Sequence, residues 1–581
     1  MATPTEDKSV SGLVAVTDAP GVARKQLTGG AEPAAVIPGA AEGADAAERR
    51  SRRWVRMLAW LMWPIGLIEA AIVLFVCYLQ VSRTESVSSD GASNALQAWD
   101  MLHGNLLLHG WTLTDVSFYT TELPEYMIVE AIRGLHADVL HVSAAVTYTL
   151  LVLTAGLVAR GRARGRDGVL RFLIAAGIMV APQLGPGAFI LIFQPDHTGT
   201  QVPLLVTWLV IDRAPRRWRW YVPFVVAVLL AWVEVADRLV VLIGVAPLAA
   251  VCAVRAYQAV VQRRERLRSA WFELSLIAAA GASVEISSIV VKRISEHGGF
   301  SVLPVANGLA PVSEMSSHLW LMVESVTGLY GADVFGMSSP GLNAGIAAVH
   351  LVGLALAVWA LWLVLRRFFR CDDLIAQVLA LGILINLGAY LLSTTPTTYW
   401  SAREIAGVLP AGAVLAGRML AGRFRAARLV PAMAVVLACY VAALGYTVAQ
   451  PSVPAISQDL ADWLTAHHFT YGLSSYGLAN TTTLASGGAV DLRPVTWYNA
   501  DVAAGPYEFN QSWYDPQKHD ANFIVLMNPP QPLDPIAMWE VLDRFGPAAQ
   551  TYDVGRYVIL VYDTNLLTDF SPSLPNQPAA T

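Results

Sequence analysis

Eleven apolar segments, separated by short polar stretches, occupy most of the chain between residues 54 and 448. A helix needs about 20 apolar residues to cross the hydrocarbon core of a bilayer. Hydrophobic residues make up 55% of the 581 residues and charged residues only 14%, a balance that excludes an ordinary soluble protein. The pattern predicts a polytopic all-α membrane bundle with spans at 54–80, 138–159, 169–193, 198–212, 220–235, 238–257, 271–291, 343–365, 374–393, 404–420 and 429–448.

Arginine clusters predict the orientation of this bundle. With eleven spans, every cluster falls on the same side of the membrane. Arginine-rich loops stay in the cytoplasm, so we expect a multi-pass plasma-membrane protein with its N-terminus inside and residues 450–581 outside. The clusters flank apolar runs instead of forming a basic stripe, which argues against nucleic-acid binding. They lie at residues 49–56, 160–166, 213–219, 263–268, 366–370 and 423–428.

Composition divides the chain into three parts. Residues 1–53 are rich in Ala, Gly, Pro and Thr and are predicted to be a disordered cytoplasmic tail. Residues 54–449 form the transmembrane domain. Residues 450–581 alternate helix-like and strand-like pieces and predict an extracytoplasmic α/β domain, with helices at 456–468 and 535–545, the second capped by Asp534. Its predicted strands are 470–476, 481–485, 490–495, 522–527 and 557–562.

The outer loop 81–137 carries the first candidate site. Apolar residues at helical spacing predict a helix over Ala92–Leu102 that lies along the membrane surface and holds Asp90 above the lipid headgroups. A carboxylate in that place can accept a proton from a hydroxyl group or help to bind a metal. The alternative is structural, because Ser88, Ser89 and Asp90 are all good helix N-caps.

This order of parts resembles the GT-C superfamily of polyprenyl-phosphate-dependent glycosyltransferases. In that superfamily an essential acid in the first outer loop precedes a surface helix ending in Leu-x-x-Gly. Here Asp90 precedes Ala95-Leu-Gln-Ala-Trp-Asp-Met-Leu-His-Gly104, with Met101 in place of that leucine. Protein mannosyltransferases have an Asp-Glu pair, whereas Gly91 follows Asp90 in this chain, so the aminoarabinose-transferase-like branch is the nearer one.

The resemblance implies a glycosyltransferase acting on the outer face. The donor would be a sugar on polyprenyl phosphate, and the acceptor a cell-envelope glycan, lipid or protein. Asp90 would be the catalytic base. Asp196 and His197, in the second outer turn, would bind a divalent metal ion and the donor phosphate respectively, or else form only a polar turn. Arg403, at the mouth of the tenth segment, would grip the lipid phosphate, since a guanidinium can donate two parallel hydrogen bonds.

Five more positions are candidates for substrate binding or for the phosphate contact. Asp100 lies on the predicted surface helix, and Arg238 in an Asp-Arg break that is either a phosphate ligand or a local ion pair. Glu285, near the outer end of its span, is expected to line the same cavity. Lys292 and Arg293 are rival phosphate ligands on the outer side.

Two other functions remain open. Acids within or near spans also suit an ion-coupled transporter or flippase of a lipid-linked or small polar substrate. No inverted repeat supports that function, and a transporter has little use for a folded outer domain. A non-catalytic sensor with an outer binding domain is the third interpretation. The acids that raise the transporter alternative are Glu69, Glu234, Glu273 and Glu285.

Overall fold

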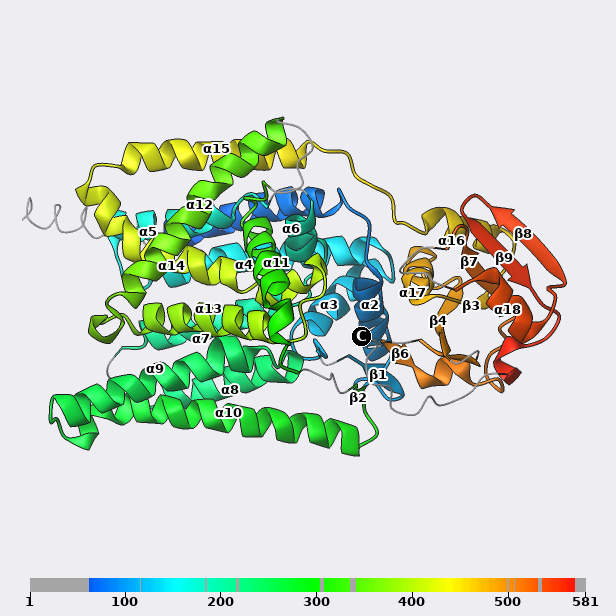
Figure 1. Ribbon diagram of the computed structural model, residues 1–581, viewed down its shortest axis with the longest axis horizontal. Coiled ribbons are helices and arrows are strands. Elements are labelled where there is room, and N and C mark those ends of the chain that lie inside the picture. Colours follow the sequence, from blue (N-terminus) through cyan, green and yellow to red (C-terminus); the bar gives the residue numbers. More distant parts are fainter. Residues whose placement is uncertain are drawn as a thin grey trace, which may run out of the picture. The chain divides into compact units, whose positions relative to one another are not determined.

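The computed structural model describes residues 62–114, 116–182, 185–215, 219–303, 308–334, 341–498, 501–505, 507–530 and 536–569. The predicted disordered tail 1–53 and the predicted cap Asp534 lie outside these residues. Leu67–Thr581 forms one compact unit, and Met1–Gly66 falls in another. Figure 1 shows the helices and strands of the described residues.

Among the described residues, seven helices are long and apolar enough to cross a membrane. An eighth span results if the 3-10 helix η8 (Tyr399–Ile405) and α14 (Val408–Ala426), which meet at 49°, are taken together. Each of these eight coincides with a predicted segment. The seven are Met62–Ser82, α4 (Asp138–Arg160), Val241–Gln262 including α9 (Ala246–Tyr257), Leu267–Glu296 including α10 (Trp271–Glu296), α12 (Leu342–Leu365), α13 (Leu374–Leu392) and α15 (Val430–Val448).

The other three predicted spans coincide with shorter helices. These are α5 (Gly165–Met179), α7 (Thr198–Arg213) and α8 (Val222–Ala236), of 15, 16 and 15 residues. At about 1.5 Å per residue they extend roughly 22–24 Å, less than the ~30 Å of a hydrocarbon core. The predicted span 169–193 is broken after α5 because prolines at 182 and 186 remove backbone donors, and the chain resumes as α6 (Pro186–Ala188) and a π-helix, Phe189–Phe193.

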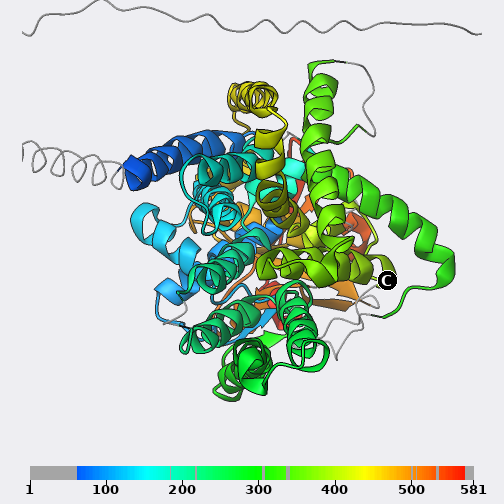
Figure 2. The ribbon, with the colours of Figure 1, turned by 90° about the vertical axis from the view of Figure 1, so that its left-hand side faces the viewer.

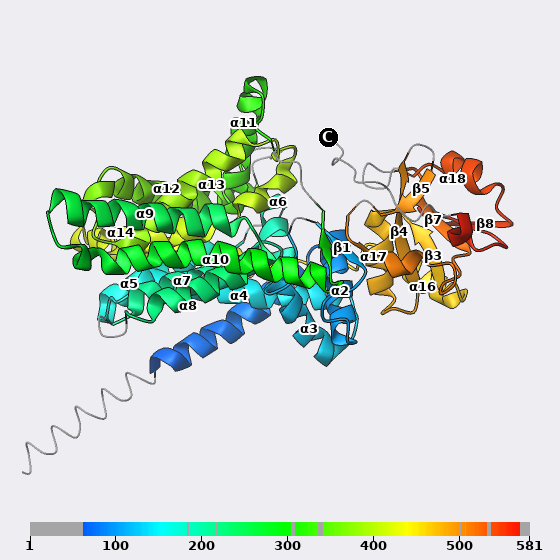
Figure 3. The ribbon, with the colours of Figure 1, turned by 90° about the horizontal axis from the view of Figure 1, so that it is seen from below.

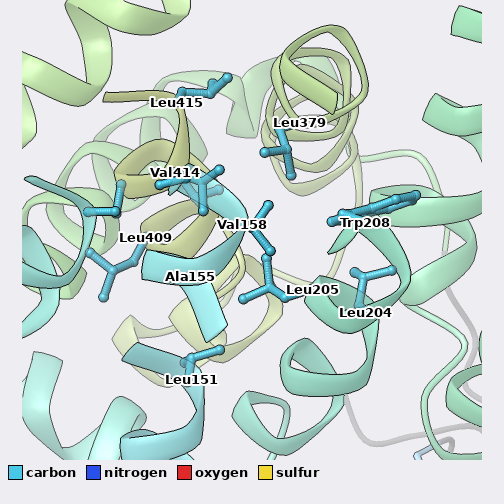
Figure 4. Packing of buried hydrophobic residues seen from close by; sticks show 14 of the residues in the cluster. Leu151, Ala155, Val158, Leu204, Leu205, Trp208, Leu379, Leu409, Val414 and Leu415 are labelled. Carbon is cyan, nitrogen blue, oxygen red and sulfur yellow. The ribbon is translucent and has the colours of Figure 1, made fainter. Parts of the chain in front are cut away.

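The core of the bundle surrounds α4. The hydrophobic window of α4 is 72% buried, against 28% for Leu267–Glu296 and 17% for Met62–Ser82, whose apolar side chains face outward. Figure 4 shows Val158 of α4 beside Leu205 of α7, with Trp208 of α7 and Leu379 of α13 close by. A buried central helix and apolar outer helices are what a bilayer requires of a bundle.

The arginine-rich connections lie at one end of this bundle. Arg162 donates to the carbonyl oxygen of Ala214 (2.7 Å), which joins the α4–α5 and α7–α8 connections. Arg418 of α14 is buried and forms ion pairs with Asp212 of α7 (3.1 Å) and Asp373 at the start of α13 (2.8 Å). Figure 2 views the bundle from this side. The buried arginine and its two partners therefore tie α7, α13 and α14 together at the end opposite α2 (Figure 1).

The first outer loop and the tail share a hydrophobic core at the other end. Helix α2 (Ser89–Leu102) packs against α3 (Glu122–Arg133) and against α17 (Tyr476–Ala485) of the tail. Strand β1 (Trp111–Leu113) pairs with β2 (Ser301–Val302) and, antiparallel, with β6 (Phe509–Asn510). Figures 1 and 3 show these elements together. Three segments far apart in the chain thus form one small sheet.

The tail has a six-stranded mixed sheet of order β5-β4-β3-β7-β9-β8. Four of the predicted strands are confirmed, but the predicted strand 481–485 is wrong: these residues belong to α17, which connects the parallel strands β3 and β4. Both predicted helices are present as α16 (Gln458–Ala466) and α18 (Met538–Phe545). The strands are β3 (Tyr471–Ser474), β4 (Asp491–Tyr498), β5 (Asp501–Ala504), β7 (Phe523–Met527), β8 (Gln550–Val554) and β9 (Tyr557–Val561).

The sequence did not predict α3, in the loop 81–137, or α11 (Met315–Leu329), in the predicted outer segment 292–342. Helix α11 packs against η8 and α13. With 15 residues it is shorter than the length used to recognise a span.

Candidate functional site

Asp90 lies in the first turn of α2 and does not cap the helix. The cap is Ser88, whose hydroxyl oxygen accepts from the amide of Gly91 (3.0 Å). The carboxylate of Asp90 accepts instead from the hydroxyl group of Tyr476 (3.1 Å) and from Nη1 of Arg403 (3.2 Å). The side chain is 45% exposed, so the carboxylate is both oriented by two donors and open to a substrate.

Gly91 lies where α2 packs closely against its neighbours. A Cβ atom at this position would lie 2.5 Å from Cδ2 of Leu140 and 3.2 Å from Oε1 of Gln194. Since real Cβ atoms do not approach other atoms as closely as 2.5 Å, a larger residue would require the ends of these two side chains to shift.

Arg403 reaches the site from η8, at the outer end of α14. Its Nη1 group bonds Asp90, and its Nε lies 3.8 Å from Oε1 of Glu404. The side chain is 45% exposed. An exposed ion pair contributes only ~0–1 kcal/mol, so an anionic ligand can displace Asp90 from the guanidinium at little cost.

Asp196 and His197 are buried in the turn that precedes α7. Oδ1 of Asp196 accepts from Nδ2 of Asn94 on α2 (3.0 Å). Burial, with the Asp90 carboxylate as the next cause, raises the pKa of Asp196 to about 7. The hydrogen bond from Asn94 therefore holds this turn against α2, the helix that carries Asp90.

His197 forms a buried ion pair with Asp237. Its Nδ1 lies 2.9 Å from Oδ2 of Asp237, and both side chains are almost fully buried. Burial alone would lower the pKa of His197, but the Asp237 carboxylate raises it to about 9. The backbone of His197 is left-handed, with φ 58°, which turns the chain into α7. His197 is thus fixed as a cation close to Arg403 and Glu404.

Glu508 and Tyr476 come from the tail and were not predicted as site residues. Glu508 is 5% exposed and accepts from Nε2 of Gln97 (3.0 Å) and from the Thr114 hydroxyl (3.2 Å). Burial, followed by the charges of Asp90 and Asp196, raises the pKa of Glu508 to about 8. No local motif marks either residue, since only the β1–β6 pairing and the packing of α17 on α2 bring them here.

Glu122 of α3 was also missed. It is fully buried, and its Oε1 accepts from the backbone amide of Thr200 in the first turn of α7 (3.1 Å). Burial raises its pKa well above the usual range. Glu122 therefore braces the turn that carries Asp196 and His197.

Several predicted site residues lie elsewhere. Asp100 accepts from Nε1 of Trp111 and from Nδ2 of Asn105, both at 2.7 Å, and so folds the loop after α2. Arg238 is exposed, because Asp237 bonds His197 instead of its neighbour. Glu285 is exposed on α10. The predicted roles of Asp100, Arg238 and Glu285 gain no support from these positions.

Two further predicted phosphate ligands lie on α10 and pair with an acid of the same helix. Lys292 and Arg293 are exposed on α10 and pair with Glu296 at 3.8 and 3.2 Å. The acid that α10 does cover is Glu234 of α8, which accepts from the hydroxyl groups of two α10 serines, Ser283 and Ser287. This contact joins α8 to α10. The side chains that bond Asp90 of α2 come instead from η8 and the tail.

The structure offers no ready metal site in the part of the chain that it describes. No three His, Cys, Asp or Glu side chains gather there in a geometry suited to a metal ion. Asp196 uses Oδ1 for Asn94, and Asp90 is engaged by Arg403 and Tyr476. The divalent metal ion predicted for Asp196 stays a prediction.

An apolar crevice lies on the membrane side of the site. It has a volume of about 20 Å³ and runs between α7, α13 and α14. Its polar end includes Gln201, whose Nε2 donates to the carbonyl oxygen of His197 (3.4 Å), and Gly407, which follows η8. The crevice does not include Asp90, whose side chain is partly exposed.

No protein-family model matches the chain, and no curated protein matches it in sequence. Among solved structures it is similar to ArnT from Cupriavidus metallidurans bound to undecaprenyl phosphate, with a TM-score of 0.49 and 14% identity, over 88% of this chain and 99% of that one. It is also similar to the oligosaccharyltransferase of Archaeoglobus fulgidus. The TM-score is 0.44 (12% identity, 79% of this chain and 68% of that one) for the complex with Zn and sulfate. For the same protein tethered to an acceptor peptide with the NVT sequon, the TM-score is 0.42, with 11% identity over 80% of this chain and 69% of that one.

At TM-scores below 0.5, none of these likenesses carries an argument about this chain. At identities of 11–14% these likenesses concern the course of the chain. The chemistry has to be argued from the residues around Asp90.

Proposed function

We propose that the protein is an integral membrane glycosyltransferase that moves a sugar from polyprenyl phosphate to an acceptor on the outer face. The observation that carries this proposal is the contact of Asp90 with Arg403 and Tyr476 at the end of the bundle opposite the arginine-rich connections. A carboxylate and a guanidinium beside each other supply the two groups that such a transfer needs, a proton acceptor and a phosphate ligand.

Asp90 acts as the general base. An acceptor hydroxyl forms the new bond to the anomeric carbon of the sugar while Asp90 takes its proton. The bond from that carbon to the phosphate oxygen breaks, and the electron pair leaves with the polyprenyl phosphate. Tyr476 orients the carboxylate by donating to Oδ1, which leaves the lone pairs of Oδ2 for Arg403 or for the acceptor.

Arg403 binds the donor phosphate. In the structure it is paired with Asp90, so donor binding exchanges one anion for another at the guanidinium and frees Asp90 to act as a base. His197, held as a cation by Asp237, adds positive charge near Arg403. Fixed cations stabilise the charge that develops on a leaving phosphate.

The proposed topology places the donor where it is needed. The arginine-rich end of the bundle faces the cytoplasm, and α2, η8 and the tail face the outside. A lipid-linked donor then reaches Arg403 from the bilayer, while the acceptor reaches Asp90 from the aqueous side.

The test compares envelope glycans of a deletion strain complemented with wild type or with Asp90→Asn. We expect mass spectrometry to find a glycan that is missing in the deletion strain, restored by wild type and not restored by Asp90→Asn. An envelope restored by Asp90→Asn would contradict the proposal.

A second candidate function is proton-coupled transport, favoured by two acids of α3, the half-buried Glu125 and the buried Glu130. Burial raises the pKa of Glu125 to about 7 and that of Glu130 to about 9. Neither carboxylate oxygen of Glu130 has a hydrogen-bond partner among the described residues. Proteoliposomes distinguish the two functions, since a transporter moves protons with a solute across the bilayer, whereas the transferase leaves the internal pH unchanged.

A further inference from the structure

An exposed aromatic ring of the tail lies next to the residue that orients Asp90. Tyr507 is 53% exposed, and its ring packs edge-to-face on Tyr476 with centroids 5.2 Å apart and planes at 66°. The hydroxyl group of Tyr476 bonds Asp90 at 3.1 Å. Tyr507 is therefore one ring away from the carboxylate that we assign as the base.

The position of Tyr507 is fixed from its C-terminal side. Glu508, the next residue, is buried and bonds Gln97 of α2 and Thr114, and β6 begins directly after it. The pairing of Phe509 with Thr112 continues this attachment into β1. A ring held in this way keeps its exposed face without the entropic cost of ordering it for a ligand.

The charges around the site select the kind of acceptor. Four carboxyl groups lie around the site, those of Asp90, Asp196, Glu404 and Glu508. Arg403 pairs with two of them, Asp90 and Glu404. An anionic acceptor would have to compete with the donor phosphate for Arg403, which already pairs with Asp90 and Glu404. A neutral polyhydroxyl compound would instead find several hydrogen-bond acceptors beside an exposed aromatic face, the combination that fixes ligands in mostly apolar sites.

We propose that Tyr507 and Tyr476 form a platform for a carbohydrate acceptor, on which a sugar ring lies with its C–H face against Tyr507 and presents a hydroxyl group to Asp90. This proposal rests on the proposed function and narrows its acceptor from a glycan, lipid or protein to a carbohydrate. It also assigns the tail a direct part in substrate binding. Tyr507 takes no part in bond making and acts by holding the acceptor.

The test uses purified full-length protein in nanodiscs and a panel of neutral disaccharides (maltose, cellobiose, mannobiose and lactose) as probes, read by saturation-transfer NMR. We expect at least one disaccharide to bind wild type and Tyr507→Phe, because the ring and not its hydroxyl group forms the platform. Tyr507→Ala should bind it about ten-fold more weakly. The control is Trp539→Ala, which removes another exposed aromatic side chain, on α18, and should bind as wild type does.

The same variants are then compared in the complemented deletion strain. Tyr507→Ala should lower the amount of restored glycan, and Tyr507→Phe should not. If Asp90→Asn abolishes the glycan while Tyr507→Ala binds disaccharides as wild type does, the platform is refuted and the transferase stands. If Asp90→Asn leaves the glycan intact, the proposed function itself fails. Wild type that binds none of the disaccharides also refutes the platform.

Discussion

Arg403 Nη1 lies 3.2 Å from Asp90 Oδ2, which joins a helix of the first outer loop to the entrance of a late span across 313 positions of sequence. Each residue can hold the other in place only while no stronger ligand is present. Under the proposed function, this pair is a resting arrangement in which the residue proposed to bind the phosphate is paired with the proposed base, and donor binding should separate them.

Substitution of Arg403 should abolish donor binding. Undecaprenyl phosphate should raise the melting temperature of wild type and not of Arg403→Ala, since a ligand stabilises only the state that it binds. Arg403→Lys should show a smaller rise, because an ammonium group cannot donate two parallel hydrogen bonds. Arg293→Ala, on the exposed face of α10, is the control and should respond as wild type does. An unchanged response in Arg403→Ala would place the phosphate elsewhere.

Loss of the Tyr476 hydroxyl group should slow transfer without abolishing it. Tyr476→Phe removes one hydrogen bond to Asp90, which corresponds to about 1.5–3 kcal/mol for a bond to a charged group and a rate lower by ~10- to 150-fold. The measurement is the rate of glycan formation by purified protein added to membranes of the deletion strain, which keep their own donor and acceptor. Tyr471→Phe, which removes a buried hydroxyl bonded to the backbone of Trp513, is the matched control. Equal rates in both variants would show that Tyr476 acts only through packing.

Glu508 should make the protein less stable as the pH rises. Its pKa is about 8 in the folded protein and near 4.5 when unfolded, so its stabilising contribution is complete below pH 4.5 and is lost as the pH rises toward 8. His197, with a folded pKa of about 9, changes stability in the same direction above its unfolded value. Glu508→Gln should therefore show a shallower fall of melting temperature between pH 5 and 8 than wild type. Asp462→Asn, an exposed acid on α16, should retain the wild-type slope, and a wild-type slope in Glu508→Gln would show that Glu508 is ionised.

The topology can be read by labelling single cysteines from outside intact cells. In a variant without the four native cysteines, Asp462→Cys in the tail should react with an impermeant maleimide. Arg268→Cys, in the exposed connection before α10, should react only after the cells are opened. Labelling of both residues from outside would overturn the orientation and the location of the site.

The apolar segments and the helix after Asp90 could be predicted because each depends on local composition and periodicity. The early end of α5 could not, since burial among other helices makes a segment apolar whether or not it crosses the bilayer. Helices α7 and α8 are about as long as their predicted segments. The sequence 481–485 was interpreted as a strand because its threonines favour strands, but tertiary packing on α2 and β4 makes it part of α17.

The candidate site could be predicted only where a charged residue lies at the end of an apolar segment. Asp90, Asp196, His197 and Arg403 lie at ends of apolar segments, and the structure brings these four together. Asp100 and Glu285 were also predicted as site residues, but Asp100 bonds groups of a loop and Glu285 is exposed on α10. The sequence alone does not distinguish such a carboxylate from one in a site. Tyr476 and Glu508 depend on contacts of long range, which no local pattern records.

The most direct test of the central claim is Asp90→Asn measured for transfer and for donor binding in the same preparation. Asparagine keeps the size of the side chain and removes the proton acceptor, so transfer into deletion-strain membranes should fall by about 10²–10⁴. Because the competing carboxylate is also gone, undecaprenyl phosphate should raise the melting temperature at least as much as in wild type. Asp100→Asn, which alters a loop contact on the same helix, should keep transfer. Near-normal transfer by Asp90→Asn would contradict the account.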